Sequence, residues 1–154
     1  MMNELANLHR KHENLDSSLQ YYKKSLLCMK RRHKNKYLEN YETAKIIINI
    51  ATVCYLQMNL PDSLKYHYHA LEVLQRVMTK QELAQDQILS ANGLDTEGQV
   101  NLTGELQDTY AEKGKVHMST ANLFRLMGEE DQARAQYRAA LDSFELINDC
   151  NVYK

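Results

Sequence analysis

Three stretches of this 154-residue chain resemble one another, and each has the pattern of two helices joined by a tight turn. The clearest stretch runs from Asn49 to Leu71, with a small residue at Ala51 and a second small position in the pair Ala70–Leu71. Weaker copies run from Glu4 to Leu26 and from Ser119 to Leu141. Small residues at matching positions let paired helices pack closely, so the pattern predicts a short array of antiparallel helix hairpins.

The distribution of helix-breaking residues supports an all-α fold. Pro61 is the only proline, and all five glycines follow residue 92. Proline is tolerated in the first turn of a helix, where its missing N–H has no partner to lose, so Pro61 suits the start of a helix after the turn at residues 59–62. Apolar residues recur at three- and four-residue steps, as in the predicted stripe Tyr137, Leu141 and Phe144, and strand-like alternation is absent.

Charge and hydropathy narrow the classes of partner. The net charge is -1, which argues against a nucleic-acid binder. The charge is unevenly distributed: residues 1–90 hold 13 Lys and Arg against 9 Asp and Glu, whereas residues 91–154 hold 6 against 11. The basic run Lys30–Lys36 suits the negative end of a helix, with a nuclear import signal as the alternative. Ile46–Leu56 is too short to span a bilayer, and the polar start lacks an apolar signal region. We therefore expect a cytoplasmic protein with no membrane partner.

Nothing in the sequence assembles a catalytic or metal site. The three cysteines are scattered, as free thiols are in a reducing compartment. Cys54 is predicted to lie buried between helices, where a thiolate is disfavoured. His67 and His69 cannot share a helical face, and His12–Glu13 begins a zinc-protease pattern that ends in Asp16 rather than histidine. No phosphate-binding, dinucleotide or nucleophile-elbow motif occurs. The sequence predicts no enzyme, no metal and no cofactor.

The hairpins resemble the tetratricopeptide repeat, a helix-turn-helix unit of about 34 residues with small residues where its helices cross. The third copy matches at small, aromatic, glycine, alanine and leucine positions: Ala121, Phe124, Gly128, Ala133, Tyr137, Ala140 and Leu141. The middle copy supplies Ala51, Ser63, Ala70 and Leu71, with Met58 where glycine is usual. The first supplies Leu5, Ala6, Ser18, Tyr22 and Leu26. The histidines His9, His67 and His117 fall where the family places aromatic or interface residues.

The resemblance implies the architecture of the whole chain. Matching alanines are 45 residues apart between the first two copies and 70 apart between the last two, which is similar to the long-helix variants of kinesin light chain and Pins. It implies about six helices stacked as a short right-handed superhelical solenoid. We expect a single domain over residues 1–154, with repeat 1 at about 2–33, repeat 2 at about 37–91, a loop at about 92–101 and repeat 3 at about 102–148.

The resemblance also implies a concave groove, lined by the first helix of each hairpin, that holds a partner peptide or helix. By register, the lining residues are Asn7, Arg10, Lys11, Lys45, Asn49, Thr52, Tyr55, Lys115, Ser119, Asn122 and Arg125. Asparagine offers a peptide backbone both a donor and an acceptor, and the cations favour an acidic partner. The predicted function is a protein-binding scaffold or adaptor.

The alternative function is structural. A helical array needs polar end caps, and no capping helix is evident after Ile147. Uncapped ends would expose apolar surface, as in a fragment or subunit of a larger helical-repeat assembly that docks through those ends, or in a chain that associates with itself.

Overall fold

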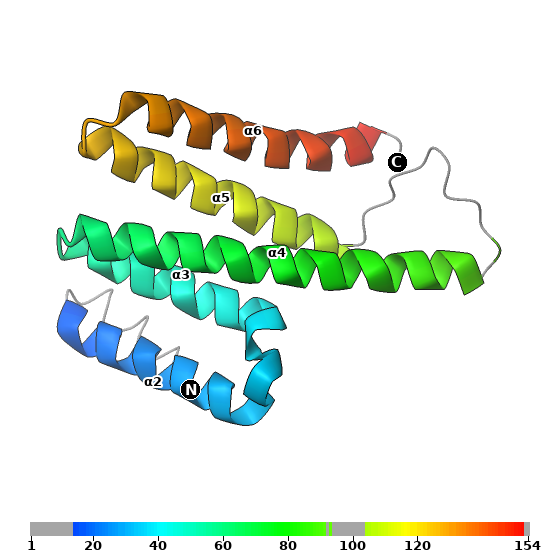
Figure 1. The fold of residues 1–154 in the computed structure, drawn as a ribbon, viewed down its shortest axis with the longest axis horizontal. Coiled ribbons are helices and arrows are strands. Elements are labelled where there is room, and N and C mark those ends of the chain that lie inside the picture. Colours follow the sequence, from blue (N-terminus) through cyan, green and yellow to red (C-terminus); the bar gives the residue numbers. More distant parts are fainter. Residues whose placement is uncertain (1–13, 92, 94–103, 153–154) are drawn as a thin grey trace. The chain divides into compact units, whose positions relative to one another are not determined.

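The computed structural model describes residues 14–91, 93 and 104–152, and all regular structure in these residues is helical. The elements are α2 (Leu15–His33), the 3-10 helix η1 (Lys34–Glu39), α3 (Tyr41–Leu56), α4 (Leu60–Ala91), α5 (Gly104–Leu126) and α6 (Glu130–Val152), drawn in Figure 1. The prediction of an all-α fold is confirmed. The predicted helix before residue 13 and most of the predicted loop at 92–101 lie outside the described residues, and the superhelical stacking stays a prediction.

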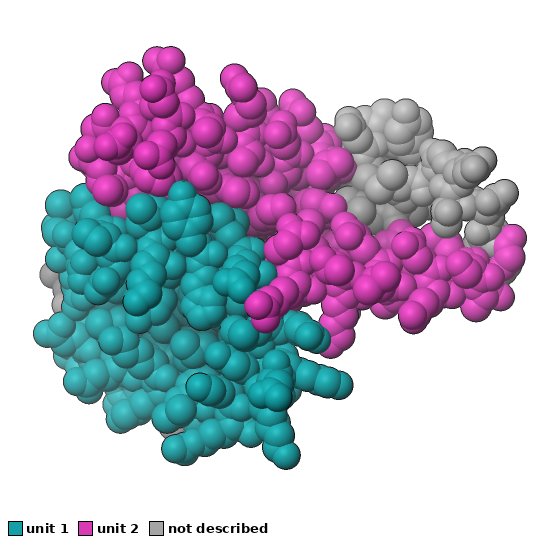
Figure 2. All heavy atoms as spheres, in the orientation of Figure 1, with its two compact units in different colours: residues 1–73 teal, residues 74–154 magenta. Residues whose placement is uncertain are grey.

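The chain divides into two compact units, residues 1–73 and 74–154, which Figure 2 draws in separate colours. The helix α4 is continuous through the division, so it gives its first part to unit 1 and its remainder to unit 2. The segment from Lys80 to Ser90 is helical as part of α4, and it leaves Leu83 and Ile88 exposed.

Asparagine side chains fix where the helices of unit 1 begin. The Asn14 Oδ1 accepts a hydrogen bond from the Ser17 N–H at 3.3 Å, and the Asn40 Oδ1 accepts from the Glu42 N–H at 2.9 Å. The Asn59 side chain makes the same kind of contact, since its Oδ1 accepts from the Asp62 N–H at 3.4 Å. Each cap satisfies an N–H that has no partner within the helix, and the cap at Asn59 lies in the turn predicted at residues 59–62.

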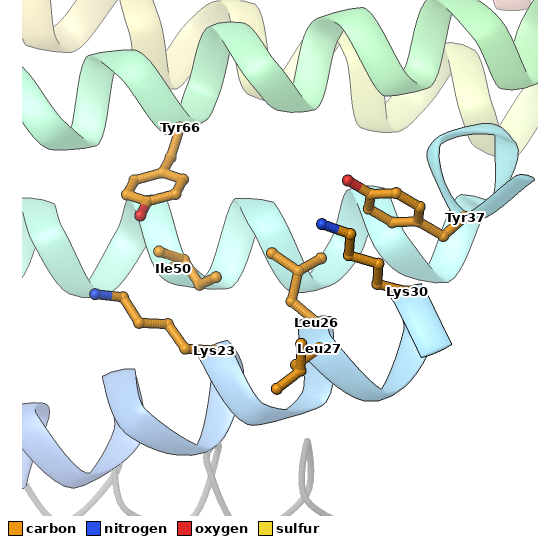
Figure 3. A pocket seen from close by; sticks show the side chains of 7 residues that line it. All are labelled: Lys23, Leu26, Leu27, Lys30, Tyr37, Ile50 and Tyr66. Atoms are coloured by element: carbon orange, nitrogen blue, oxygen red, sulfur yellow. The ribbon is translucent and has the colours of Figure 1, made fainter. Parts of the chain in front are cut away.

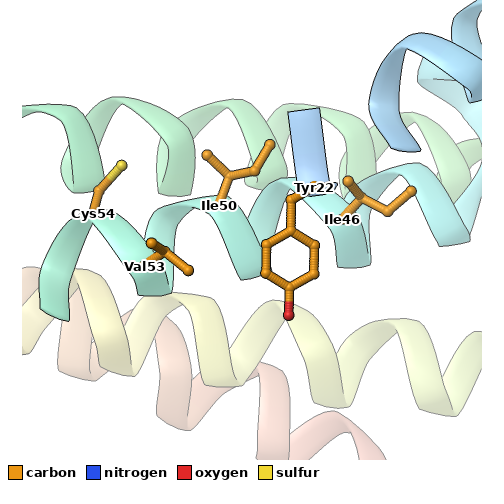
Figure 4. Close-up of a cluster of buried hydrophobic side chains, with 5 residues drawn as sticks. All are labelled: Tyr22, Ile46, Ile50, Val53 and Cys54. Carbon is orange, nitrogen blue, oxygen red and sulfur yellow. The ribbon is translucent and has the colours of Figure 1, made fainter. Parts of the chain in front are cut away.

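The core of unit 1 joins α2 to α3. Figure 4 shows Tyr22 of α2 beside a row of α3 side chains, and all of them are almost fully buried: Tyr22, Ile46, Ile50, Val53 and Cys54. The start of α4 packs on the other side of α3, so closely that the Ser63 hydroxyl donates to the Ala51 carbonyl at 2.7 Å. This contact needs a residue as small as alanine at 51, as the repeat pattern predicted.

Unit 2 packs α5 between α6 and the second part of α4. At Gly114 the helices α5 and α6 approach so closely that a Cβ on this residue would lie 2.7 Å from the Phe144 ring. On its other side, α5 is tied to α4 by side-chain hydrogen bonds from Thr109 to Gln81, from Tyr110 to Glu82 and from Lys113 to Gln75, at 2.9, 3.1 and 3.2 Å.

The reversals after α3 and after α5 are structural copies of each other. The Asn59 N–H donates to the Cys54 carbonyl at 2.9 Å, and 70 residues later the Glu129 N–H donates to the Phe124 carbonyl at 2.8 Å. In each reversal the preceding residue has a positive φ, 58° at Met58 and 80° at Gly128. This is the Schellman arrangement, in which a left-handed residue ends a helix. The two hairpins α3–α4 and α5–α6 therefore repeat each other in backbone as well as in sequence.

One part of the predicted packing is wrong. Tyr137 and Leu141 were expected on the buried stripe of α6, but their side chains are 37% and 55% exposed. The buried side of α6 consists instead of Ala133, Ala140 and Ser143, whose small side chains let α5 come close. Since the helix periodicity gives two apolar stripes on α6, only the stripe that meets α5 is covered in this chain.

Replacing Gly114 with alanine tests the close approach of α5 and α6. The added methyl group overlaps the Phe144 ring, so the free energy of unfolding should fall by about 1–3 kcal/mol. Gly104→Ala is the matched control, because no atom lies within 4 Å of its added Cβ. Urea denaturation of both variants measures the difference. Equal stabilities of the two variants would contradict the packing described.

Replacing Met58 with glycine tests the repeated reversal. A non-glycine residue at positive φ is strained by about 1–2 kcal/mol, and glycine removes this strain. Glycine also makes the unfolded chain more flexible, which offsets part of the gain. Met58→Gly should therefore raise the free energy of unfolding by about 1 kcal/mol. Gly128→Ala should lower it by a similar amount. Met58→Ala is the control: the side chain is 72% exposed, so its loss should change stability by less than about 0.5 kcal/mol. A stabilisation shared by the alanine and glycine variants would refute the strain.

Candidate functional site

Four of the predicted peptide-binding residues lie in a row on α3 and are named the α3 face: Lys45, Asn49, Thr52 and Tyr55. Lys45 and Tyr55 are exposed and the other two are half-buried, whereas the opposite side of the helix carries the core. The Lys45 ammonium lies 5.6 Å from the Tyr41 ring centre, a distance that suits a cation–π contact. The Thr52 hydroxyl donates to the Ile48 carbonyl at 2.9 Å, so it keeps only its acceptor function for a ligand.

Four more predicted residues lie in a row on α5 and are named the α5 face: Lys115, Ser119, Asn122 and Arg125. All four are exposed. Two of them already have partners, because Lys115 forms an ion pair with Glu112 at 3.4 Å and Asn122 accepts a hydrogen bond from the Tyr137 hydroxyl. The ion pair is exposed and weak, so it leaves the ammonium available to a carboxylate of a partner.

The remaining predicted residues, Asn7, Arg10 and Lys11, lie outside the described residues. The α3 face belongs to unit 1 and the α5 face to unit 2. Each face by itself presents one amide group beside one or two cations, which is chemistry for holding a polar, negatively charged chain. Neither face combines a nucleophile with a general base.

Unit 1 also contains a pocket that the sequence reasoning missed, named the α2 pocket. Its volume is about 260 Å³, and its lining comes from four elements: Lys23, Leu26, Leu27, Lys30, Tyr37, Ile50 and Tyr66. Figure 3 shows the two lysine side chains extending from α2 toward α3, with Tyr66 of α4 above Ile50. The spacing of the four α2 residues, at i, i+3, i+4 and i+7, was the available signal for one face. Tyr37 belongs to η1 and Tyr66 to α4, and the periodicity of α2 does not predict that their rings lie beside it.

Comparison with known proteins bears on residues 1–34, which match a family model described as a tetratricopeptide repeat. The match includes Asn7, Arg10 and Lys11 and covers the first of the three similar stretches, so for this part of the chain the resemblance is confirmed. Tetratricopeptide repeats generally mediate protein–protein interactions and are typically non-enzymatic. The long-helix variant stays a prediction.

The other comparisons add little. No curated protein matches the chain. Among solved structures, the crystal structure of BtubC (BKLC) from P. vanneervenii is similar at 17% identity with a TM-score of 0.42, over 96% of this chain and 63% of that one. This chain therefore spans less than two thirds of that protein's length, and at this TM-score no argument rests on the likeness. Within the described residues, no helix is long and apolar enough to cross a membrane.

Two of the histidines predicted to lie at helix interfaces, His67 and His117, fall within the described residues. His67 is almost fully buried, and its Nδ1 lies 2.8 Å from the Ser63 carbonyl, to which it donates as a neutral ring. Burial lowers the pKa of His67 below its ordinary value of 6.5, and the hydrogen bond to Ser63 opposes this in part. His117 is half-buried with its Nδ1 2.7 Å from Gln136 Oε1. In the described parts of the chain, no three His, Cys, Asp or Glu side chains gather to bind a metal.

Cys54 fits the predicted buried thiol. Its side chain is 3% exposed, and burial together with the Asp62 carboxylate raises the pKa of the thiol. A thiol held in its neutral form is a poor nucleophile, so Cys54 belongs to the core and carries no chemistry.

The lowered pKa of His67 makes a testable statement about pH. Because the pKa of His67 is lower in the folded chain, the unfolded chain binds a proton on this ring more readily. The contribution of neutral His67 to the stability of the fold is therefore present above about pH 6.5 and is lost as the pH falls below it. Replacing His67 with glutamine should therefore flatten the decline of the unfolding free energy between about pH 7.5 and about pH 5. If His67→Gln keeps the wild-type slope, the ring does not titrate as inferred.

Proposed function

We propose that this chain is a protein–protein interaction scaffold whose α3 and α5 faces bind an acidic peptide or an acidic partner helix. The observation that carries the proposal is the row of four polar side chains on α3, exposed at Lys45 and Tyr55 and half-buried at Asn49 and Thr52, while the opposite side of the helix is buried in the core. The general role of tetratricopeptide repeats in protein binding supports the same conclusion.

The chemistry of the two faces selects the partner. Asn49 and Asn122 each offer a donor and an acceptor, which suits the N–H and C=O groups of a peptide backbone. Lys45, Lys115 and Arg125 favour carboxylates through charge-assisted hydrogen bonds and attract an acidic segment from a distance. The proposal also includes Asn7, Arg10 and Lys11, which the sequence predicts for the same groove; it is set in the cytoplasm and involves neither nucleic acid nor cofactor.

A second candidate function is assembly with other helical-repeat chains. It is favoured by the apolar side chains that α6 leaves exposed, Leu141 and Leu146, at 55% and 43%. Such residues at the outer side of a hairpin are covered in longer arrays by the next repeat.

Labelled peptide pools test the leading proposal. One pool fixes Asp and Glu at alternate positions of otherwise random peptides, and a second pool has Asn and Gln in their place. By fluorescence anisotropy the acidic pool should bind more tightly, and the variant with Lys45, Lys115 and Arg125 replaced by Glu should bind it at least about tenfold more weakly.

A matched variant separates a specific face from net charge. Lys65→Glu, Lys80→Glu and Arg134→Glu change the charge by the same amount at exposed positions off the two faces. This control should keep the affinity within about threefold. Equal weakening of the two triple variants, or equal binding of the two pools, would refute an acidic partner on these faces.

A further inference from the structure

The α2 pocket is suited to side chains of another protein rather than to a cofactor. Its volume of about 260 Å³ falls below the range of about 300–1,000 Å³ that holds a drug-sized ligand. The floor is apolar, formed by Leu26, Leu27 and Ile50, and the side chain of Leu27 is 48% exposed. A space of this size and lining takes one or two aliphatic side chains.

Two cations border this apolar floor. Lys23 and Lys30 are exposed and stand seven residues apart on α2, which puts them about 10 Å apart along the same side of the helix. Neither ammonium has an ion-pair partner among the residues that the structure describes. The occupant of the pocket therefore carries carboxylates next to its apolar side chain.

The two units of the chain carry opposite charge. Residues 1–73 hold 11 Lys and Arg against 7 Asp and Glu, a net charge of +4 with His neutral. Residues 74–154 hold 8 against 13, a net charge of -5. Two copies of the chain consequently repel when like units meet and attract when unit 1 of one copy meets unit 2 of the other.

The C-terminal half of α6 offers the complementary surface, named the α6 patch: Leu141, Asp142, Glu145 and Leu146. All four side chains are exposed, and at the helical repeat they occupy an arc of about 140° on one side of α6. Within this arc the two carboxylates lie between the two leucines. These are the two features that the α2 pocket requires.

We propose that the chain associates with a second copy head to tail, the α6 patch of one copy docking into the α2 pocket of the next. One of the patch leucines enters the apolar space, and Asp142 and Glu145 face Lys23 and Lys30. The contact joins two different surfaces, so each added copy leaves a free pocket and a free patch at the ends, and association continues past the dimer unless the arrangement closes into a ring.

This association is independent of the proposed peptide binding. On α3 the pocket uses Ile50, which lies about 140° around the helix from Lys45 of the α3 face. Changes on one surface therefore leave the other intact, and the two proposals fail separately.

Sedimentation velocity of the wild-type chain over a wide range of concentration is the first measurement. The average mass should rise with concentration at about 0.05 M NaCl and should rise less at about 0.5 M, because the added salt screens the exposed charges. A strictly monomeric chain at low salt overturns the proposal.

Charge reversal then identifies the two surfaces. Lys23→Glu with Lys30→Glu, and separately Asp142→Lys with Glu145→Lys, should each weaken association at least about tenfold. Mixing the two variants should restore it, because each altered surface meets its altered complement and each unaltered surface meets its natural one. Lys24→Glu with Lys65→Glu changes the charge of unit 1 equally at exposed positions that belong to neither the α2 pocket nor the α3 face, and it should associate as the wild type does. Failure of the mixture to associate, or equal loss in this control, refutes the pairing, and circular dichroism checks that every variant is folded.

Discussion

The close approach of paired helices is the constraint on which the rest of this structure depends. At Ala51 the neighbouring helix comes near enough for the Ser63 hydroxyl to reach a backbone carbonyl, and at Gly114 the Phe144 ring fills the space of a missing side chain. Burial at these crossings uses small residues, so each hairpin gains its stability from contact along the helices rather than from a thick core.

The hairpins could be predicted because their determinants are local. An asparagine cap, the sole proline in a first turn and a glycine after a helix all act on residues within one turn of themselves. Met58 is instructive, since it departs from the glycine expected in the repeat and yet adopts the same left-handed backbone as Gly128. The two hydrogen bonds that close the reversal outweigh the strain of one side chain. The two reversals therefore share one backbone conformation, although one has methionine and the other glycine at the left-handed position.

The candidate sites show where sequence reasoning stops. The α3 and α5 faces follow from periodicity, because residues at three- and four-residue steps share a side of one helix. The α2 pocket does not, since it brings together Lys23, Tyr37 and Tyr66 from three separate elements. The exposure of Leu141 was mispredicted for a related reason: periodicity shows that a helix has an apolar stripe, but not whether another helix covers it. Both failures concern contacts between elements distant in the sequence.

The arrangement of surfaces around α3 has a consequence for affinity. One side of the helix carries Lys45 and Asn49 for the proposed peptide, and a different side carries Ile50 for the proposed neighbour. Head-to-tail copies would therefore repeat the peptide-binding faces along the assembly without covering the α3 face. A partner with several acidic segments would engage successive copies, and each engagement after the first is intramolecular, with an effective concentration set by the spacing of its segments. Weak single contacts of exposed lysines and amides, each worth about 1 kcal/mol or less, become a specific and reversible grip in this way.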